Sequence, residues 1–123
     1  MAGPFTQAAD AVAAGIGLLR EAAPDAGKAF GSLAVAATTT RALDAKTKEL
    51  MALAISIAVH CEGCVAYHTR AAHKHGASRQ EVAETVALAV YMGGGPAAVY
   101  TACDPGADGH AGDNGAHQFC AGA

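Results

Sequence analysis

The feature that most constrains the fold is the absence of any sustained period-2 alternation in a chain rich in alanine and leucine. A sequence of this kind favours helices over strands, and its glycines and prolines fall where helices would begin or end. We therefore expect an all-α, single-domain bundle of about six helices. Counting the capping residues, the expected helices are 6–20, 24–37, 44–59, 61–76, 78–95 and 96–102.

Several of these boundaries rest on capping residues. Asp44 is a good N-cap for the third helix, and Ser78 with Glu81 forms a capping box for the fifth. Gly76 suits the position after a helix end, and Pro96 suits the first turn of a short last helix. The composition then changes at Asp104, because residues 104–123 are rich in Gly, Asp and His and show no apolar period. We expect a helical domain over 1–103 and a flexible tail over 104–123.

Composition limits the partners and the location of the protein. Apolar residues make up 52% of the 123 residues and charged residues only 15%, so we expect apolar surface to be buried between subunits of a homo-oligomer. The net charge of −3, without a Lys/Arg cluster, argues against nucleic acid as a partner. No apolar stretch reaches the roughly 18 residues of a membrane span, and no basic region precedes AVAAGIGLL as in a signal peptide. We therefore expect a cytoplasmic protein.

The segment CEGCVAYH, residues 61–68, carries the most specific chemistry. In a reducing compartment a C-x-x-C is more often catalytic or metal-binding than a static bridge. At about 100° per residue, Cys61, Cys64 and His68 share one face of the expected fourth helix. Both thiols lie in its first turn, where unpaired N–H groups and the helix dipole favour thiolate.

The preceding helix supplies a carboxylate. From Leu50 to Val59 the chain is almost entirely apolar, yet Glu49, Ser56 and His60 form one narrow polar stripe on it. A carboxylate there suits a general base, provided that a partner or solvent offsets the cost of its burial. A turn near His60 would fold the two helices into a hairpin. The carboxylate, both thiols and the imidazole could then converge on one pocket.

Other interpretations compete with this one. Zinc could use Cys61, Cys64 and His68 as three ligands. However, the three lie within one helix, no second pair of ligands follows, and the tail histidines are the candidates left for the fourth position. Glu49 could simply favour the helix dipole. The other polar residues suit structural roles: Ser56 as a helix serine bonded to the preceding turn, His60, His73 and His75 at helix ends, Cys103 as a buried thiol, and the tyrosines in packing.

The stretch ELMALAISIAVHCEGCVAYHTRAAHKHGAS resembles the core of the carboxymuconolactone decarboxylase / alkylhydroperoxidase D superfamily. The redox branch of that superfamily carries a Glu, a C-x-x-C that starts twelve positions later, and a His four positions past the second Cys. Glu49, Cys61, Cys64 and His68 match this pattern. The segment QEVAETVALAVYMGGGPAAVY is similar to the next part of the family sequence, so the resemblance covers about 35–102. It implies an alkylhydroperoxidase D-like helical fold, usually a homotrimer or homohexamer.

The resemblance also implies a reaction that needs no cofactor. The dithiol would reduce a hydroperoxide, with Glu49 and His68 as the proton relay, and a dithiol or protein thiol would restore the pair. It assigns the attack to Cys64, whereas the helix dipole favours Cys61 as the thiolate. Lactone decarboxylation is an alternative, but the decarboxylase branch lacks the C-x-x-C. A non-enzymatic metal-binding or oligomeric module is another. The chain departs from the family pattern after TACD, where members commonly continue with a longer helix.

Overall fold

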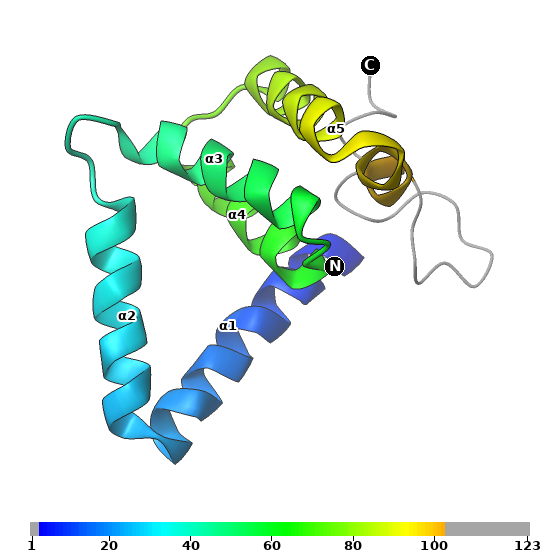
Figure 1. The fold of residues 1–123 in the computed structure, drawn as a ribbon. Coiled ribbons are helices and arrows are strands. Elements are labelled where there is room, and N and C mark those ends of the chain that lie inside the picture. The colour runs from blue at the N-terminus through cyan, green and yellow to red at the C-terminus, as the bar shows by residue number, and fades with distance from the viewer. Residues whose placement is uncertain (1–2, 103–123) are drawn as a thin grey trace.

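The computed structural model describes residues 3–102, and these form five helices and no strand (Figure 1). The all-α, single-domain prediction is confirmed for this part of the chain. The predicted boundary at residue 103 and the tail 104–123 lie outside the described residues. The helices are α1 (Pro4–Ala22), α2 (Pro24–Thr38), α3 (Ala45–Ala58), α4 (Glu62–Lys74) and α5 (Arg79–Ala102).

The prediction of about six helices is corrected to five at the Gly-rich segment. The predicted fifth and sixth helices are two halves of α5, which changes direction at Gly94. Gly94 has φ 69° and ψ −155°, a combination that only glycine adopts readily, and Pro96 then starts the second half. The glycines thus interrupt the helical geometry where predicted, but no connecting loop separates the two halves.

The capping residues act as the sequence predicts. The Asp44 side chain accepts a hydrogen bond of 2.7 Å from Thr47 N–H at the start of α3. At the start of α5, Ser78 Oγ accepts from Glu81 N–H while the Glu81 carboxylate accepts from Ser78 N–H, which completes the capping box. Gly76 follows α4 with φ 86°, so a left-handed glycine ends that helix. These local features fix the start of α3, the end of α4 and the start of α5.

The hydrophobic core lies where α3 packs against α4 and α5. Leu53 and Ile57 of α3 are its largest fully buried side chains. The other buried residues of this core are all alanine or valine, which allow the helices to approach closely: Val65, Ala72, Ala77, Val82, Val86, Ala89 and Ala97. This core holds α3 and α4 side by side, and both helices contribute side chains to the candidate site.

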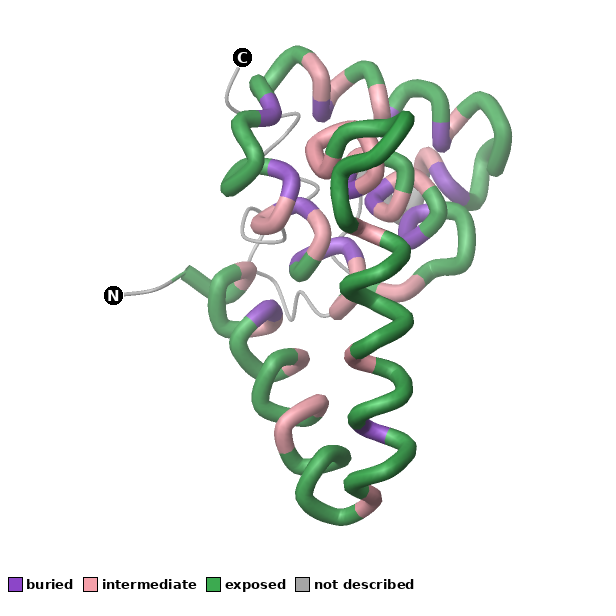
Figure 2. Tube along the Cα trace, turned by 90° about the vertical axis from the view of Figure 1, so that its left-hand side faces the viewer, coloured by how far each residue is buried: buried purple, intermediate pink, exposed green. Residues whose placement is uncertain are grey.

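The α1–α2 hairpin projects from this core as a V (Figure 1). The N-terminal half of α1 lies against α4, where Arg70 pairs with Asp10 and also donates a 3.3 Å hydrogen bond to the Ala9 carbonyl. A Cβ added to Gly63 would come within 2.7 Å of Val12 Cγ2, so α1 passes directly over one of the two residues between the cysteines. In contrast, α2 is exposed along most of its length (Figure 2).

Large apolar side chains are exposed on several helices. Phe30 and Leu33 of α2, Ile55 of α3, and Tyr91 and Met92 of α5 are all more than half exposed, with Tyr91 reaching 81%. Where such side chains form one contiguous patch, the patch typically marks an interaction site. None of the helices within residues 3–102 is long and apolar enough to cross a membrane.

Replacing Glu81 by glutamine is expected to make the fold less stable at neutral pH. Glu81 accepts a hydrogen bond of 2.6 Å from Lys46 Nζ and one of 2.7 Å from Ser78 N–H. Lys46 first, and then Ser78, hold the pKa of Glu81 below its ordinary value. A depressed carboxyl pKa stabilises the fold above the ordinary value, and the contribution is lost as pH falls through the folded-state pKa. The melting temperature of Glu81→Gln should therefore lie a few degrees below wild type at pH 7, and the gap should close below about pH 4.

Melting curves at pH 7 and pH 3 test this expectation. Glu84→Gln is the matched control, because Glu84 is an exposed residue of the same helix whose described contact is a hydrogen bond from Gln80. A gap of equal size at both pH values would show that the Glu81 charge does not provide the stabilisation.

Candidate functional site

A disulfide joins Cys61 and Cys64 at the start of α4, with their Cα atoms 5.2 Å apart. The sequence predicts that this helix begins near Cys61. In the structure Cys61 is the N-cap, one residue before α4 begins at Glu62, and Cys64 lies in the first turn. The Cys64 N–H also donates a hydrogen bond of 3.3 Å to Cys61 Sγ. Both cysteines are half-buried. The pair is thus bonded, close to a helix N-terminus and partly accessible, as a reversible redox pair requires.

The turn between α3 and α4 sets the position of Cys61. The turn begins after Ala58, and Cys61 N–H donates a 3.0 Å hydrogen bond back to the Ser56 carbonyl. His60 has φ 58°, a left-handed conformation that is uncommon for a residue other than glycine. Such conformations concentrate at functional sites and are held by their surroundings. His60 therefore lies beyond the helix rather than on its polar stripe, and its place in this structure is to close the turn.

Glu49 and His68 form a close pair between α3 and α4. His68 Nδ1 lies 2.7 Å from Glu49 Oε2. The Glu49 side chain is only 7% exposed, whereas the His68 side chain is 25% exposed. An ionised carboxylate only accepts hydrogen bonds, so we assign the proton of this contact to His68 Nδ1. That assignment leaves Nε2 as an acceptor. The imidazole offsets the cost of burying the carboxylate, and Glu49 is more than a charge near a helix start.

The α4 helix relates the two pairs. Cys64 and His68 are four residues apart on this helix, so their side chains lie on the same face one turn apart. The Tyr67 and His68 rings form a T-shaped contact, with centroids 5.2 Å apart and planes at 84°. This contact restrains the imidazole, and nothing in the sequence signals it, because adjacent helical residues normally point in different directions. The four predicted residues thus form two bonded pairs joined through α4.

The remaining candidates have structural positions or lie outside the described part of the chain. Ser56 is buried and donates a 2.6 Å hydrogen bond to the Ala52 carbonyl, as expected for a helix serine. His73 lies in the last turn of α4 and His75 is its C-cap. Cys103 is not among the described residues. Within 3–102, no three His, Cys, Asp or Glu side chains are placed to hold one metal ion.

A solved structure with a similar fold provides the first comparison. The chain resembles the apo crystal structure of a carboxymuconolactone decarboxylase family protein from Legionella pneumophila, with a TM-score of 0.74 and 42% sequence identity. The similarity covers 78% of this chain and 86% of that one. The profile of the carboxymuconolactone decarboxylase family also matches residues 24–106. The chain belongs to the carboxymuconolactone decarboxylase family. The resemblance seen in the sequence is thereby confirmed, and α1 lies outside the matched range.

The chain is also similar to two uncharacterized proteins. An uncharacterized protein of Cupriavidus necator is 43% identical over 84 residues, which are 68% of this chain and 74% of that protein. An uncharacterized protein encoded in the cox locus of Paracoccus denitrificans is 32% identical over 69 residues, which are 56% of this chain and 62% of that protein. The family range in this chain includes Glu49, the C-x-x-C pair and His68.

Proposed function

We propose that this carboxymuconolactone decarboxylase family protein is a thiol-dependent peroxidase that reduces hydroperoxides through Cys61 and Cys64. The observation that carries the proposal is the buried Glu49–His68 pair one helical turn from the Cys61–Cys64 disulfide. A disulfide supplies a two-electron couple, and an oriented imidazole supplies a route for protons. All of these groups are side chains of the protein, so the proposed reaction needs no cofactor.

In the oxidative half-reaction, the Cys64 thiolate attacks one oxygen of the hydroperoxide. The O–O bond breaks, the peroxide is reduced to an alcohol or to water, and Cys64 becomes a sulfenic acid. The Cys61 thiol then attacks Cys64 Sγ, water leaves, and the disulfide forms. Two thiols are oxidised for each peroxide reduced.

His68 moves the protons in this scheme, and Glu49 orients it. His68 Nε2 takes the proton of the Cys64 thiol and returns it to the departing oxygen as the O–O bond breaks. Glu49 Oε2 accepts the hydrogen bond from His68 Nδ1–H, with Oε2 and Nδ1 2.7 Å apart, and the carboxylate stabilises the imidazolium that forms between these two steps. In hydrolases with a Ser-His-Asp triad, the carboxylate likewise orients the imidazole and the imidazole transfers the protons. In this scheme Glu49 is a positioning residue and His68 is the acid–base.

In the reductive half-reaction, a dithiol or protein thiol attacks the disulfide and passes through a mixed disulfide. The leaving sulfur departs more readily as a stabilised thiolate. Cys61 Sγ accepts the Cys64 N–H at the N-terminus of α4, where the helix dipole also favours negative charge. This contact favours Cys61 as the thiolate that leaves in the reductive half-reaction. Cys64 is favoured for the attack on peroxide, because His68 lies one turn away on the same face of α4.

Steady-state peroxide consumption tests the proposed function. Purified protein is supplied with hydrogen peroxide, an alkyl hydroperoxide or a lactone substrate, together with a panel of dithiol and monothiol donors. The proposal expects peroxide loss that depends on both protein and donor, with dithiols more effective than monothiols. Turnover of the lactone without peroxide activity would contradict the proposal and would favour decarboxylation.

We also propose that the protein works as a homo-oligomer, as a trimer or a hexamer. The exposed apolar side chains of α2, α3 and α5 leave a surface that a stable interface would cover. Such an interface buries roughly 800 Å² on each partner. Light scattering behind a sizing column should give three or six times the chain mass of 12.1 kDa at micromolar concentration. A monomer under these conditions would refute the oligomer.

A further inference from the structure

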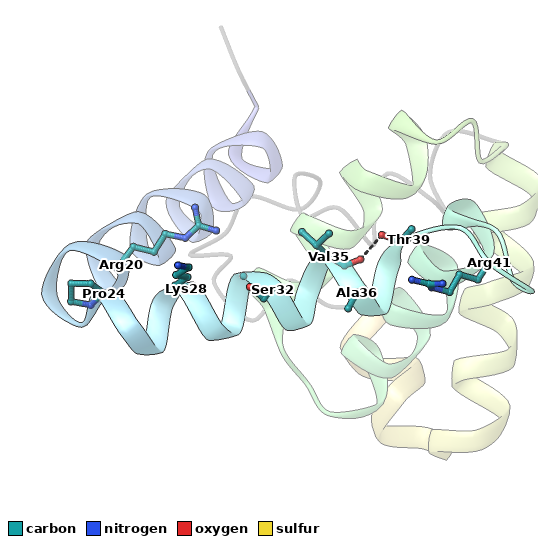
Figure 3. Close-up of a pocket in the computed structure, with 9 residues that line it drawn as sticks. Arg20, Pro24, Lys28, Ser32, Val35, Ala36, Thr39 and Arg41 are labelled. Carbon is teal, nitrogen blue, oxygen red and sulfur yellow. Dashed lines mark hydrogen bonds between the residues drawn. The ribbon is translucent and has the colours of Figure 1, made fainter.

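An open groove of about 690 Å³ runs along one side of α2 (Figure 3), and its lining includes none of the residues of the proposed redox site. Its lining includes three cations, Arg20 from the last turns of α1, Lys28 of α2, and Arg41 beyond the end of α2. The apolar part of the lining includes Pro24, Val35 and Ala36. No carboxylate is among the lining residues. The groove is therefore positive at its ends and apolar along its length.

The three cations of the groove lack partners within residues 3–102. Other basic side chains of the protein are engaged: Lys46 pairs with Glu81, Lys48 donates to the Thr39 carbonyl and Arg70 pairs with Asp10. The side chains of Arg20, Lys28 and Arg41 make no hydrogen bond or ion pair in the described structure. Unpaired like charges along one groove of an acidic chain raise its affinity for anions.

Two glycines of α2 leave space for the Arg20 side chain. A Cβ at Gly27 would lie 2.7 Å from Arg20 Cγ, and a Cβ at Gly31 would lie 2.7 Å from its Nη2 atom. The Arg20 side chain therefore lies flat along α2, and any larger residue at either position would displace it. Glycine inside a helix is destabilising relative to alanine. Here these glycines give the guanidinium room beside Lys28, at one end of the groove, while Arg41 lies at the other (Figure 3).

The groove lies on a different side of α2 from the exposed side chains of Phe30 and Leu33. At about 100° per residue, Pro24, Lys28 and Val35 fall on one face, whereas Phe30 and Leu33 fall on the opposite face. The apolar face suits a second copy of the chain. The cationic face calls for a ligand that brings negative charge, so we assign the two faces to different partners.

We propose that this groove binds a small amphipathic oxyanion. Its carboxylate or phosphate head lies between Arg20 and Lys28, and its alkyl body lies along Val35 and Ala36. Arginine and lysine are the side chains that recognise oxyanions, and arginine does so with two parallel N–H groups. The volume falls within the range of about 300–1,000 Å³ typical of small-molecule sites. This binding is independent of the proposed peroxidase activity.

Titration calorimetry with four matched probes tests the site in the full-length protein. Octanoate and octyl phosphate carry both the head and the chain, octanol carries only the chain, and inorganic phosphate carries only the head. Exposed ion pairs contribute modestly, so each cation should account for about a two- to fivefold change in affinity. We expect octanoate, octyl phosphate or both to bind at least about tenfold more tightly than octanol. Comparing the affinities of octanoate and octyl phosphate shows whether the groove prefers a carboxylate or a phosphate head group.

Variants locate the binding. Lys28→Gln should weaken the octyl anion about two- to fivefold, and the double variant with Arg20→Gln should weaken it about tenfold. Lys74→Gln and Arg79→Gln are the controls, because they neutralise exposed cations outside the groove and should change affinity less than twofold. Lys28→Gln keeps the test valid even if loss of Arg20 disturbs the hairpin.

Four outcomes would overturn the inference. They are no octyl anion binding up to millimolar concentration, octanol binding as tightly as the octyl anions, equal weakening in the control variants, and inorganic phosphate matching octyl phosphate. The last of these would remove the apolar part of the site.

Discussion

Cys64→Ser is expected to abolish peroxide reduction, with a fall of at least about 10³-fold in the second-order rate constant. The proposed reaction starts with the Cys64 thiolate, and removing a nucleophile closes the covalent route altogether. Cys61→Ser should behave differently, because Cys64 can still attack one peroxide and stop at the sulfenic acid. A sulfenic-acid trap followed by mass spectrometry should therefore label Cys61→Ser and leave Cys64→Ser unlabelled. Stopped-flow consumption of peroxide by the reduced variants provides the rate constants.

Cys120→Ser is the matched control for this experiment. It removes one of the four thiols of the chain and keeps both members of the pair. Its rate should equal that of wild type. If Cys64→Ser were labelled and Cys61→Ser were not, the attack would belong to Cys61. The helix dipole would then outweigh the neighbouring imidazole in selecting the thiolate.

Glu49→Gln is expected to slow peroxide reduction by at least about tenfold while leaving the protein folded. Acid–base groups typically contribute about 10²–10⁴-fold, and a positioning carboxylate acts through His68. Glutamine keeps the shape and can still accept from His68 Nδ1–H, but it does not stabilise the imidazolium by charge. The substitution removes a buried charge and keeps an acceptor for His68 Nδ1–H, so the cost of burying the carboxylate disappears and the melting temperature should hold or rise slightly. The measurement is peroxide reactivity from pH 6 to 9, with melting curves on the same samples.

Glu84→Gln is the control for the chemical change itself, since it alters an exposed carboxylate of α5. A Glu49→Gln protein that reacts like wild type across this pH range would reduce Glu49 to a structural partner of His68. An unfolded variant would show that the pair holds α3 to α4, and the catalytic role of Glu49 would have to be withdrawn. A changed pH profile at unchanged stability separates catalysis from structure.

Local signals in the sequence predicted the helix boundaries well. Asp44, Gly76 and the Ser78–Glu81 box occupy the positions that their chemistry favours, because capping depends on residues within one turn. The Gly-rich segment was harder to interpret. A glycine that permits a kink and a glycine that ends a helix look alike in the sequence, so two predicted helices became the single bent α5.

The residues of the candidate site could be predicted from the sequence better than the contacts between them. Helical periodicity placed Cys64 and His68 on one face and Glu49 on a polar stripe, but the 2.7 Å contact of Glu49 with His68 depends on how α3 packs against α4. Periodicity also extended the stripe to His60, although α3 ends before it at Ala58. The contact of Tyr67 with His68 depends on side-chain rotamers that periodicity does not describe.

The α1–α2 hairpin illustrates what a pattern of apolar residues leaves open. Both helices were predicted, but neither their projection from the core nor the passage of α1 over Gly63 can be derived from residue spacing. Glycine inside a helix usually weakens it, whereas in this structure Gly27 and Gly31 provide the space for Arg20. Close approaches between distant segments of the chain are tertiary properties, and a helical period carries no information about them.

The central claim is that the two thiols are the electron source for peroxide reduction. Fully reduced protein is titrated with hydrogen peroxide below one equivalent, free thiols are counted, and the digest is mapped by mass spectrometry. The account predicts two thiols lost for each peroxide consumed, a single Cys61–Cys64 bridge, and full recovery of both thiols on adding a dithiol. If Cys61 and Cys64 both stayed reduced, or passed directly to sulfonic acid, the thiol peroxidase account would be contradicted.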